Sequence, residues 1–334
     1  MLEHGGQIHA AALRYGIPAA EWLDLSTGIN PIAFVLPLIP LAAWQRLPQE
    51  QDRLPDAAAC YYGTTNLLPL AGSQAAIQLL PQLRSRCRVG VLQPAYAEHA
   101  HAWRSAGHEV TDLAEHEIAT QIDHLDVLVL IQPNNPSGAL FTHAQLHEWH
   151  ASLAARMGWL IIDEAFIESS AQTSFAQKDM PPGLIILRSL GKFFGLAGAR
   201  VGFILAHPEL LSRMQTLLGP WSVAGPSRFV AQAALLDRSW QAATGERLQQ
   251  DGARLVQLLS NANLIPTGGC GLFQWVQTEQ AQAIHLHLAQ RGILTRIFTQ
   301  PHSLRFGLPG SAAEWQRLGT ALMQLKLNDT ARSL

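Results

Sequence analysis

Five short apolar runs constrain the fold of this chain more than any other feature. Each has the length of one strand, and segments with helical character separate them; the runs are residues 88–94, 126–133, 159–166, 183–190 and 199–207. Near-continuous runs of Val, Ile and Leu are typical of strands that are buried on both faces. Strands that alternate with helices indicate βα units. The sequence therefore predicts an α/β domain with a mostly parallel central sheet flanked by helices.

The second part of the chain predicts a smaller α+β domain. After Pro226, long helical patterns are interleaved with apolar stretches at residues 293–298 and 303–309, and a final helix is expected from Ala312. We therefore expect three parts: an N-terminal segment, 1–45, that packs with the small domain; a large ligand-binding α/β domain, 46–220; and a small C-terminal domain, 221–334.

Composition argues against a nucleic-acid or membrane partner. Only 14% of the 334 residues are charged, and the formal net charge is −2. The sequence contains no basic run of the kind that binds nucleic acid or an anionic membrane. A small ligand that carries local charge fits this composition better.

The sequence also predicts a cytoplasmic protein without a metal site. The opening residues, MLEHGGQIHA, lack the cationic start and apolar stretch of a signal peptide. The most apolar early segment, residues 32–44, is too short to span a bilayer and contains two prolines. Cys60, Cys87 and Cys270 are scattered, with neither disulfide nor zinc spacing, so we expect unpaired packing residues.

Polar residues follow two of the predicted strands, at the edge where ligands of parallel sheets bind. Asp163 comes directly after the apolar residues of one run, and the stretch IQPNNPSG, residues 131–138, ends another with two asparagines. Asp, Asn and Pro are also the usual residues of turns and helix caps. Neither feature alone predicts a function.

A third polar group lies in SLGKFFGLAGAR, residues 189–200. A lysine in a partly desolvated pocket, such as Lys192, becomes an amine nucleophile, while Ser189 and Arg200 are suited to hold a phosphate. Gly72 and Ser73 precede a predicted helix, whose N-terminus also attracts phosphate. Taken singly, Lys192 is more often a surface residue, but the combination of amine, carboxylate and phosphate donors suits pyridoxal 5′-phosphate.

The segments NNPSG, IIDEAF and RSLGKFFGLAGARVGF resemble the class I and II aminotransferases, which are fold-type I enzymes that depend on pyridoxal phosphate. The resemblance covers nearly the whole chain. It implies that Lys192 bonds covalently to the cofactor and that Asp163 keeps its pyridine nitrogen protonated. It further implies a set of cofactor contacts: Asn135 at the phenolic oxygen, Tyr96 stacked on the ring, and Gly72, Ser73, Ser189 and Arg200 at the phosphate.

The resemblance also implies a homodimer with active sites at the subunit interface. Two positions depart from the family's pattern. Phe166 stands where most members have tyrosine, so one hydrogen bond to the phenolic oxygen is missing. Leu47 lies near the expected place of the tyrosine that reaches the neighbouring subunit's phosphate, with Tyr61 or Tyr62 as alternatives under a shifted alignment.

The opening HGGQIHAAALRYGIPAAEWLDLSTGINP resembles the N-terminus of the threonine-phosphate decarboxylases of cobalamin biosynthesis. This resemblance implies decarboxylation of O-phospho-L-threonine to (R)-1-amino-2-propanol O-2-phosphate and CO2. The substrate contacts that it implies are His4, Gly5, Asn30, Asn135, Arg296 and Arg305. Two arginines suit a substrate with a carboxylate and a phosphate, but which arginine binds which group stays open.

An aminotransferase that acts on histidinol phosphate is the main alternative, because it shares the cofactor and most of these residues. The outcome depends on whether the pocket turns the carboxylate or the hydrogen of Cα out of the ring plane, and the residues alone do not decide this. A non-catalytic relative fits less well, because Lys192 is present. A dinucleotide-binding protein is also disfavoured, because no G-x-G-x-x-G follows the first strand of the main domain.

Overall fold

The computed structural model describes residues 4–325, which divide into two compact units. One unit is Ile32–Leu248. The other combines the described residues up to Pro31 with those from Gln249 onward. The domain boundaries that we predicted near residues 45 and 220 stay a prediction. Among residues 4–325, no helix is long and apolar enough to cross a membrane.

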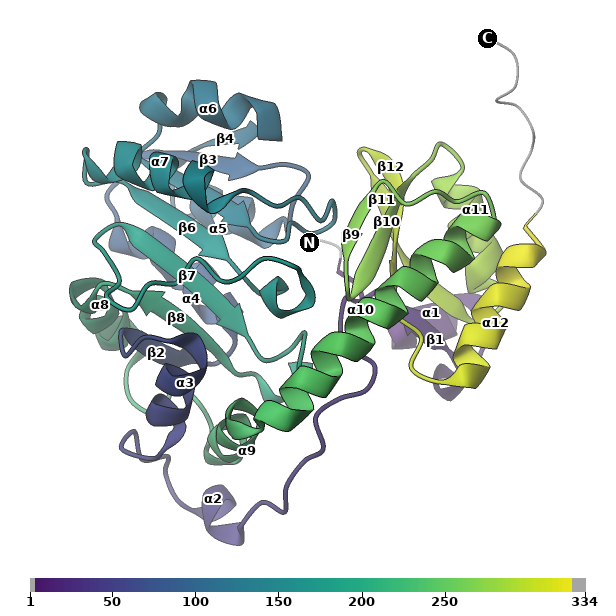
Figure 1. Cartoon of the computed structure of the whole chain (residues 1–334), viewed down its shortest axis with the longest axis horizontal. Helices are drawn as coiled ribbons and strands as arrows, with labels where there is room; N and C mark the ends of the chain where they lie inside the picture. The colour runs from purple at the N-terminus through teal and green to yellow at the C-terminus, as the bar shows by residue number, and fades with distance from the viewer. Residues whose placement is uncertain (1–3, 326–334) are drawn as a thin grey trace. The chain divides into compact units, whose positions relative to one another are not determined.

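The unit Ile32–Leu248 is built on a seven-stranded sheet with helices on both faces (Figure 1). In spatial order the strands are β2 (Leu67–Leu70), β8 (Gly202–Ala206), β7 (Leu184–Ser189), β6 (Trp159–Asp163), β5 (Val127–Ile131), β3 (Arg88–Leu92) and β4 (Glu109–Leu113). The helices of this unit include α2 (Leu41–Gln45), α3 (Leu54–Tyr62), α4 (Ser73–Leu79), α5 (Glu98–Ser105), α6 (Ile118–Gln121), α7 (His143–Ala154), α8 (Pro208–Leu218) and α9 (Gly225–Leu236). The predicted α/β fold with a mostly parallel sheet is confirmed.

Strand direction decides which loops meet at one edge of this sheet. β8 pairs antiparallel with both β2 and β7, whereas the remaining neighbours in the sheet pair in parallel. The carboxyl ends of β3, β5, β6 and β7 therefore lie at the same edge as the start of β8. Residues that follow those strands, together with residues that precede β8, can converge on one site.

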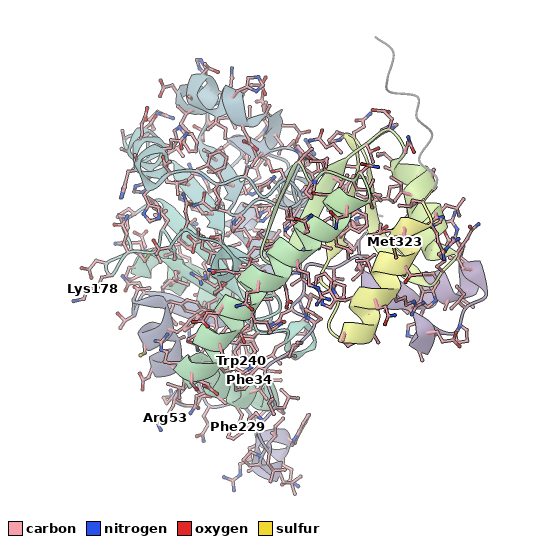
Figure 2. All side chains as sticks on the ribbon, turned by 45° about the vertical axis from the view of Figure 1, so that its right-hand side comes forward. Phe34, Arg53, Lys178, Phe229, Trp240 and Met323 are labelled. Atoms are coloured by element: carbon pink, nitrogen blue, oxygen red, sulfur yellow. The ribbon has the colours of Figure 1, made fainter. Side chains whose placement is uncertain are left out.

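Phe34 attaches the start of this unit to its body. Its ring packs edge-on against Trp240, with 5.3 Å between the ring centroids, and its backbone N–H donates to the carbonyl of Phe194 at 2.9 Å (Figure 2). Trp240 belongs to the long helix α10 (Arg238–Asn261) and also stacks on Phe194 at 5.6 Å. These aromatic contacts hold the segment after Pro31 at a defined point.

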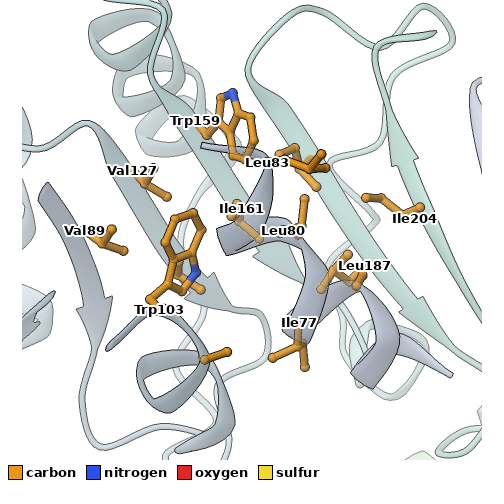
Figure 3. Packing of buried hydrophobic residues seen from close by; sticks show 14 of the residues in the cluster. Ile77, Leu80, Leu83, Val89, Trp103, Val127, Trp159, Ile161, Leu187 and Ile204 are labelled. Atoms are coloured by element: carbon orange, nitrogen blue, oxygen red, sulfur yellow. The ribbon is translucent and has the colours of Figure 1, made fainter. Parts of the chain in front are cut away.

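The core of the sheet lies between its strands and helices α4 and α5. Strand side chains alternate between the two faces, so Val89, Ile161 and Leu187 point to the same side. They pack there with Ile77 of α4 and Trp103 of α5, all essentially inaccessible to solvent (Figure 3). Burying each such aliphatic side chain stabilises the fold by roughly 1.5–3 kcal/mol. This packing keeps the strand ends at fixed positions.

Helix α7 covers the opposite face, and Thr142 precedes its first turn. Thr142 is its N-cap: its hydroxyl accepts a hydrogen bond from the backbone N–H of Gln145, and the Gln145 side chain accepts one from the N–H of Thr142. This reciprocal pair satisfies two donors that the first turn of the helix leaves free. Leu146, Trp149 and Leu153 form its buried side.

The other unit contains a five-stranded sheet. Its strands, in spatial order, are β1 (Leu23–Leu25), β11 (Ile293–Thr299), β12 (His302–Gly307), β10 (Phe273–Gln277) and β9 (Gly268–Cys270). β1 pairs in parallel with β11, and the other pairs are antiparallel. The helices α1 (Ile8–Tyr15), α11 (Ala281–Ala289) and α12 (Ala312–Met323) complete this unit. β1 places the residues that follow Leu25 beside the strands of the C-terminal part.

Candidate active site

The eight cofactor contacts expected from the sequence line one cavity in the unit Ile32–Leu248. The cavity has a volume of about 140 Å³. Its lining includes Gly72, Ser73, Tyr96, Asn135, Asp163, Ser189, Lys192 and Arg200, together with Gln74, Ile131, Ala165, Phe166, Gly191 and Ala197. These residues are scattered over more than a hundred positions of sequence, and the fold brings them together.

Sheet topology explains this convergence. Asp163 ends β6, Ser189 ends β7, and Asn135 follows β5, so the three leave the sheet at the same edge. Tyr96 follows β3 at that edge. Arg200 precedes β8, and because β8 runs in the opposite direction, its start lies at the same edge as the ends of its neighbours.

Asp163 is buried and held by two partners. The Nε2 of His99 lies 3.0 Å from its Oδ2, and the backbone N–H of Ala165 donates to its Oδ1 at 3.0 Å. Only 5% of the Asp163 side chain and 2% of the His99 side chain are exposed. An ionised carboxylate can only accept, so the imidazole donates to it. The carboxylate is thereby fixed in orientation at the wall of the cavity.

Sequence reasoning missed His99. The residue lies three positions after Tyr96, at the start of α5, and its backbone N–H donates to the Tyr96 carbonyl at 3.3 Å. This turn spacing places both rings toward the cavity side, with their centroids 6.3 Å apart. The local sequence does not single out this histidine, because its partner Asp163 lies 64 positions further along the chain.

Lys192 lies in the loop after β7 and is half-buried. Its Nζ is 5.5 Å from the centroid of the Phe166 ring, the position where the family usually has tyrosine. The loop is closed locally, because the N–H of Gly195 donates to the Lys192 carbonyl at 3.2 Å and the N–H of Gly191 donates to Ser189 Oγ at 3.1 Å. The ammonium group is thus presented to the cavity over an apolar ring.

Gly72, Ser73 and Arg200 form the end of the cavity that suits a phosphate. Gly72 has a φ of +79°, and a Cβ at this position would lie 2.6 Å from Nη2 of Arg200. The guanidinium therefore packs on backbone, beside the start of α4 at Ser73. Gly202 likewise allows the backbone of Ser73 to come close, because a Cβ at position 202 would lie 2.5 Å from the backbone nitrogen of Ser73. An exposed arginine beside a helix N-terminus attracts an anion.

Tyr96 presents a neutral aromatic ring to the cavity. Burial raises the pKa of its hydroxyl to about 12, and the nearby carboxylates of Glu98 and Asp163 add to this effect. The hydroxyl donates to Oε1 of Gln74 at 3.3 Å, and Gln74 in turn donates to Glu98 at 3.1 Å. Gln74 is a second residue that the sequence did not single out. It holds the ring from the side of α4.

The two asparagines of NNPSG play different roles. Asn134 is buried, and its Nδ2 donates to the Pro94 carbonyl at 2.8 Å and to Ser137 Oγ at 2.7 Å. Asn134 therefore holds the turn, whereas Asn135 lines the cavity. The cavity thus offers an amine, a carboxylate, an amide, an aromatic ring and an anion-binding end. This donor set fits pyridoxal phosphate.

Arg296 and Arg305 lie in the other unit, directly opposite each other on β11 and β12. Arg305 is 7% exposed, and its Nη2 donates to the Ser26 carbonyl at 2.6 Å. Burial and the neighbouring charge of Arg296 lower the pKa of the Arg305 guanidinium to about 10. Like charges opposite each other on paired strands are destabilising. An anionic ligand relieves that repulsion.

The N-terminal glycines pack around the same serine. The N–H of Gly6 donates to Ser26 Oγ at 2.7 Å, and a Cβ on Gly5 would lie 2.3 Å from the Ser26 carbonyl oxygen. Ser26 therefore connects the start of the chain to Arg305. His4 is exposed and Asn30 is buried in this unit.

Within the described part of the chain, no group of three or more His, Cys, Asp or Glu residues is arranged to hold a metal ion.

Sequence comparison identifies the family. The family described as aminotransferase class I and II matches residues 47–331. The chain therefore belongs to the class I and II aminotransferase family.

Individual relatives indicate a narrower group of proteins within this family. The threonine-phosphate decarboxylase of Pseudomonas aeruginosa is 55% identical over 326 residues, which cover 98% of each chain. A threonine-phosphate decarboxylase from Sinorhizobium sp. is 40% identical and covers 97% of this chain and 98% of its own. Among solved structures, the histidinol-phosphate aminotransferase of Sinorhizobium meliloti in complex with pyridoxal-5′-phosphate has a TM-score of 0.84 over 96% of this chain and 94% of its own, at 20% identity. That structure shows the shared fold.

Proposed function

We propose that this chain is a pyridoxal phosphate-dependent decarboxylase of O-phospho-L-threonine, which releases CO2 and (R)-1-amino-2-propanol O-2-phosphate. The observation that carries the proposal is the 55% identity, over 98% of both chains, to a threonine-phosphate decarboxylase. The cavity in Ile32–Leu248 and the arginine pair in the other unit supply roles for individual residues.

Each of the cavity residues is assigned a separate role toward the cofactor. Bound pyridoxal phosphate supplies an electron sink that accepts the electron pair left by the departing carboxylate. Asp163, oriented by His99, would hold a proton at the pyridine nitrogen. Lys192 would hold the cofactor through its aldehyde and would deliver a proton to Cα of the substrate. Arg200 and the start of α4 would hold the phosphate, and Tyr96 would pack on the ring.

The arginine pair suits the substrate's two anionic groups. O-phospho-L-threonine carries a carboxylate and a phosphate, and Arg296 and Arg305 offer two guanidinium groups on adjacent strands. Planar guanidinium forks bind such oxygens in pairs, which a lysine ammonium does not reproduce. We assign the pair to the substrate, together with His4, Gly5 and Asn30, and with Asn135 of the cavity.

A histidinol-phosphate aminotransferase is the second candidate, because a protein of that name shares the fold at a TM-score of 0.84. The two activities differ in which bond at Cα breaks. Purified protein loaded with pyridoxal phosphate is incubated with O-phospho-L-threonine, and separately with histidinol phosphate and 2-oxoglutarate. We expect CO2 and an amino-alcohol phosphate from the first mixture and no glutamate from the second.

Two controls test whether the reaction requires the phosphate of the substrate and whether it requires Lys192. L-threonine without phosphate should react far more slowly, since one anionic group is missing. Lys192→Ala protein should release no CO2. Glutamate formation without CO2 release would replace the decarboxylase proposal by the aminotransferase.

We also propose that the enzyme is a cytoplasmic homodimer that serves cobalamin biosynthesis. The support for a dimer is an exposed apolar segment that follows the anchored Phe34. Its exposed side chains are Val35, Leu36, Leu38, Leu41, Trp44 and Leu47, with Leu38 95% and Val35 79% exposed. Monomers rarely leave so many neighbouring apolar side chains in water. A second copy of the chain is the occupant that the family resemblance implies.

Sedimentation measures the oligomeric state directly. We expect a dimer for the wild type and a shift toward monomer for a Leu38→Glu, Trp44→Glu double variant. A matched change of an exposed apolar residue elsewhere in the same unit, Met157→Glu, should leave the dimer intact. A monomeric wild type at micromolar concentration would disprove the dimer while leaving the chemistry of the cavity open to the assay above.

A further inference from the structure

A buried ion triad lies directly behind the cavity. Arg188 of β7 donates from Nη1 to Glu164 Oε2 at 3.0 Å and from Nη2 to Glu168 Oε1. The exposed fractions of the three side chains are 5%, 0% and 10%. The guanidinium also lies 4.7 Å from the centroid of the Tyr62 ring. Ion pairs this deeply buried carry a desolvation cost that only good geometry offsets.

Two members of the triad are each next to a residue of the cavity wall. Glu164 directly follows Asp163, and Arg188 directly precedes Ser189. Successive side chains of a strand point to opposite faces, so Glu164 and Arg188 lie on the opposite side of the backbone from Asp163 and Ser189. The N–H of Glu164 also donates to the Leu187 carbonyl at 2.9 Å, which joins the ends of β6 and β7.

Glu164 and Glu168 also connect the ends of β6 and β7 to the loop that follows β6. Glu164 accepts from the N–H of Phe175 at 2.7 Å and from the hydroxyl of Ser174 at 2.5 Å. Glu168 belongs to the 3₁₀ turn Ile167–Ser169, two residues beyond Phe166, whose ring lies under Lys192. The triad therefore braces the strand ends that carry Asp163 and Ser189 and the turn that supports Phe166.

We propose that Arg188, Glu164 and Glu168 are positioning residues that set the geometry of Asp163 and Lys192 toward the cofactor. This inference rests on the proposed function. Without the charge at 188, two buried carboxylates lose their shared partner, and the ends of β6 and β7 are free to shift. A displacement of about 1 Å at a reacting group lowers turnover by up to roughly 100-fold.

A second buried arginine of the same unit provides the matched control. Arg228 makes a bidentate pair with Asp52, with Nε to Oδ2 at 2.7 Å and Nη2 to Oδ1 at 2.6 Å. Its side chain is 6% exposed, close to the 5% of Arg188. Neither Arg228 nor Asp52 lines the cavity. A purely structural role for Arg188 predicts that the two arginines respond alike.

The experiment titrates the visible absorbance of the pyridoxal phosphate-loaded protein with pH. If Asp163 shifts, the ring nitrogen of the cofactor holds its proton less firmly, and the nitrogen that joins Lys192 to the cofactor becomes more basic. Arg188→Met should therefore raise the pKa of the absorbance change by about one unit. Turnover should fall about 10- to 100-fold with KM changed less than about threefold. Arg228→Met should lower Tm but keep the wild-type titration. Arg188→Lys should restore part of the wild-type pKa.

A second variant keeps the test decisive. If Arg188→Met does not fold, Glu168→Gln keeps the shape and removes one charge, and the same upward shift is expected. If the wild type, Arg228→Met and the tested triad variant (Arg188→Met or Glu168→Gln) all titrate alike, the positioning role is wrong. The proposed function would still stand. A wild type that shows no visible lysine–cofactor band would overturn the proposed function, and this inference with it.

Discussion

In the unit Ile32–Leu248, buried charged side chains are held by partners from the same unit, whereas in the other unit two arginines lie opposite each other on neighbouring strands. Asp163 is paired with His99, and Arg188 lies between two glutamates. In the other unit, burial and the neighbouring charge of Arg296 lower the pKa of Arg305.

This difference separates two tasks of an enzyme. Groups that act on a resident cofactor must keep one orientation through every turnover, so built-in partners hold them. Groups that bind a substrate must also release the product, so two like charges side by side suit an anionic ligand that binds and leaves.

Lys192→Ala should abolish activity, by at least about 10³-fold, because no other side chain of the cavity supplies the amine. The visible absorbance of the loaded protein should vanish, while thermal unfolding stays close to wild type because the side chain is only half-buried. Retention of more than a few per cent of the CO2 release would contradict the role of this lysine.

Asp163→Asn should lower kcat about 10²- to 10³-fold, since an amide no longer stabilises a protonated ring nitrogen. His99→Gln should have a smaller effect, roughly tenfold, because the carboxylate remains but loses its orienting donor. Stopped assays at saturating substrate measure both. If His99→Gln matches the loss in Asp163→Asn, the histidine does more than orient the carboxylate.

Arg296→Gln should weaken substrate binding and stabilise the free protein at the same time. We expect KM for O-phospho-L-threonine to rise about 10- to 100-fold, as one charge-assisted fork is lost. The free energy of unfolding should increase by about 0.5–1 kcal/mol, because the repulsion opposite Arg305 disappears. A loss of stability in this variant would remove the contrast between the two units.

The lowered pKa of Arg305 predicts a pH dependence of anion binding. Below about pH 10 the group is charged in both the folded and the unfolded chain, so its burial cost is fully present. As pH rises through about 10, the folded chain loses this proton first, and the cost disappears together with the attraction for anions. Sulfate should therefore raise the Tm of the loaded enzyme below pH 10 more than above it. Arg305→Gln should show no such change.

Tyr96→Phe should have the smallest effect. The ring remains, and only the hydroxyl that donates to Gln74 is removed, which costs about 1 kcal/mol or roughly fivefold in kcat/KM. Tyr96→Ala, which removes the ring as well, is the matched comparison and should lose considerably more. Equal losses would mean that the hydroxyl, rather than the ring, supports the cofactor.

Strong local signals made much of this architecture predictable. The five apolar runs correspond to β3, β5, β6, β7 and β8, all with buried interiors. The two remaining strands of that sheet were not predicted, because β2 contains Pro69 and β4 is a largely exposed edge strand with polar residues. β1 is only three residues long and pairs with a strand far away in sequence.

The cavity residues were predictable where their types are distinctive for the cofactor. Partners that only the fold brings together were not: His99 lies 64 positions from Asp163, and Arg188 lies 24 from Glu164. No local pattern predicts such pairs, since histidine in a helix and arginine in a strand are ordinary residues. Only the family resemblance separated the two asparagines, by implying Asn135; in the structure Asn134 holds the turn, whereas Asn135 lines the cavity.

Covalent mapping of the cofactor tests the central claim most directly. The sequence contains three lysines, at positions 178, 192 and 326. Borohydride reduction of the loaded protein makes the lysine–cofactor bond permanent, and peptide mass analysis then locates it. The account predicts a pyridoxyl mass on the peptide that contains Lys192 and unmodified peptides for Lys178 and Lys326. A label on either of those lysines, or none at all, would contradict it.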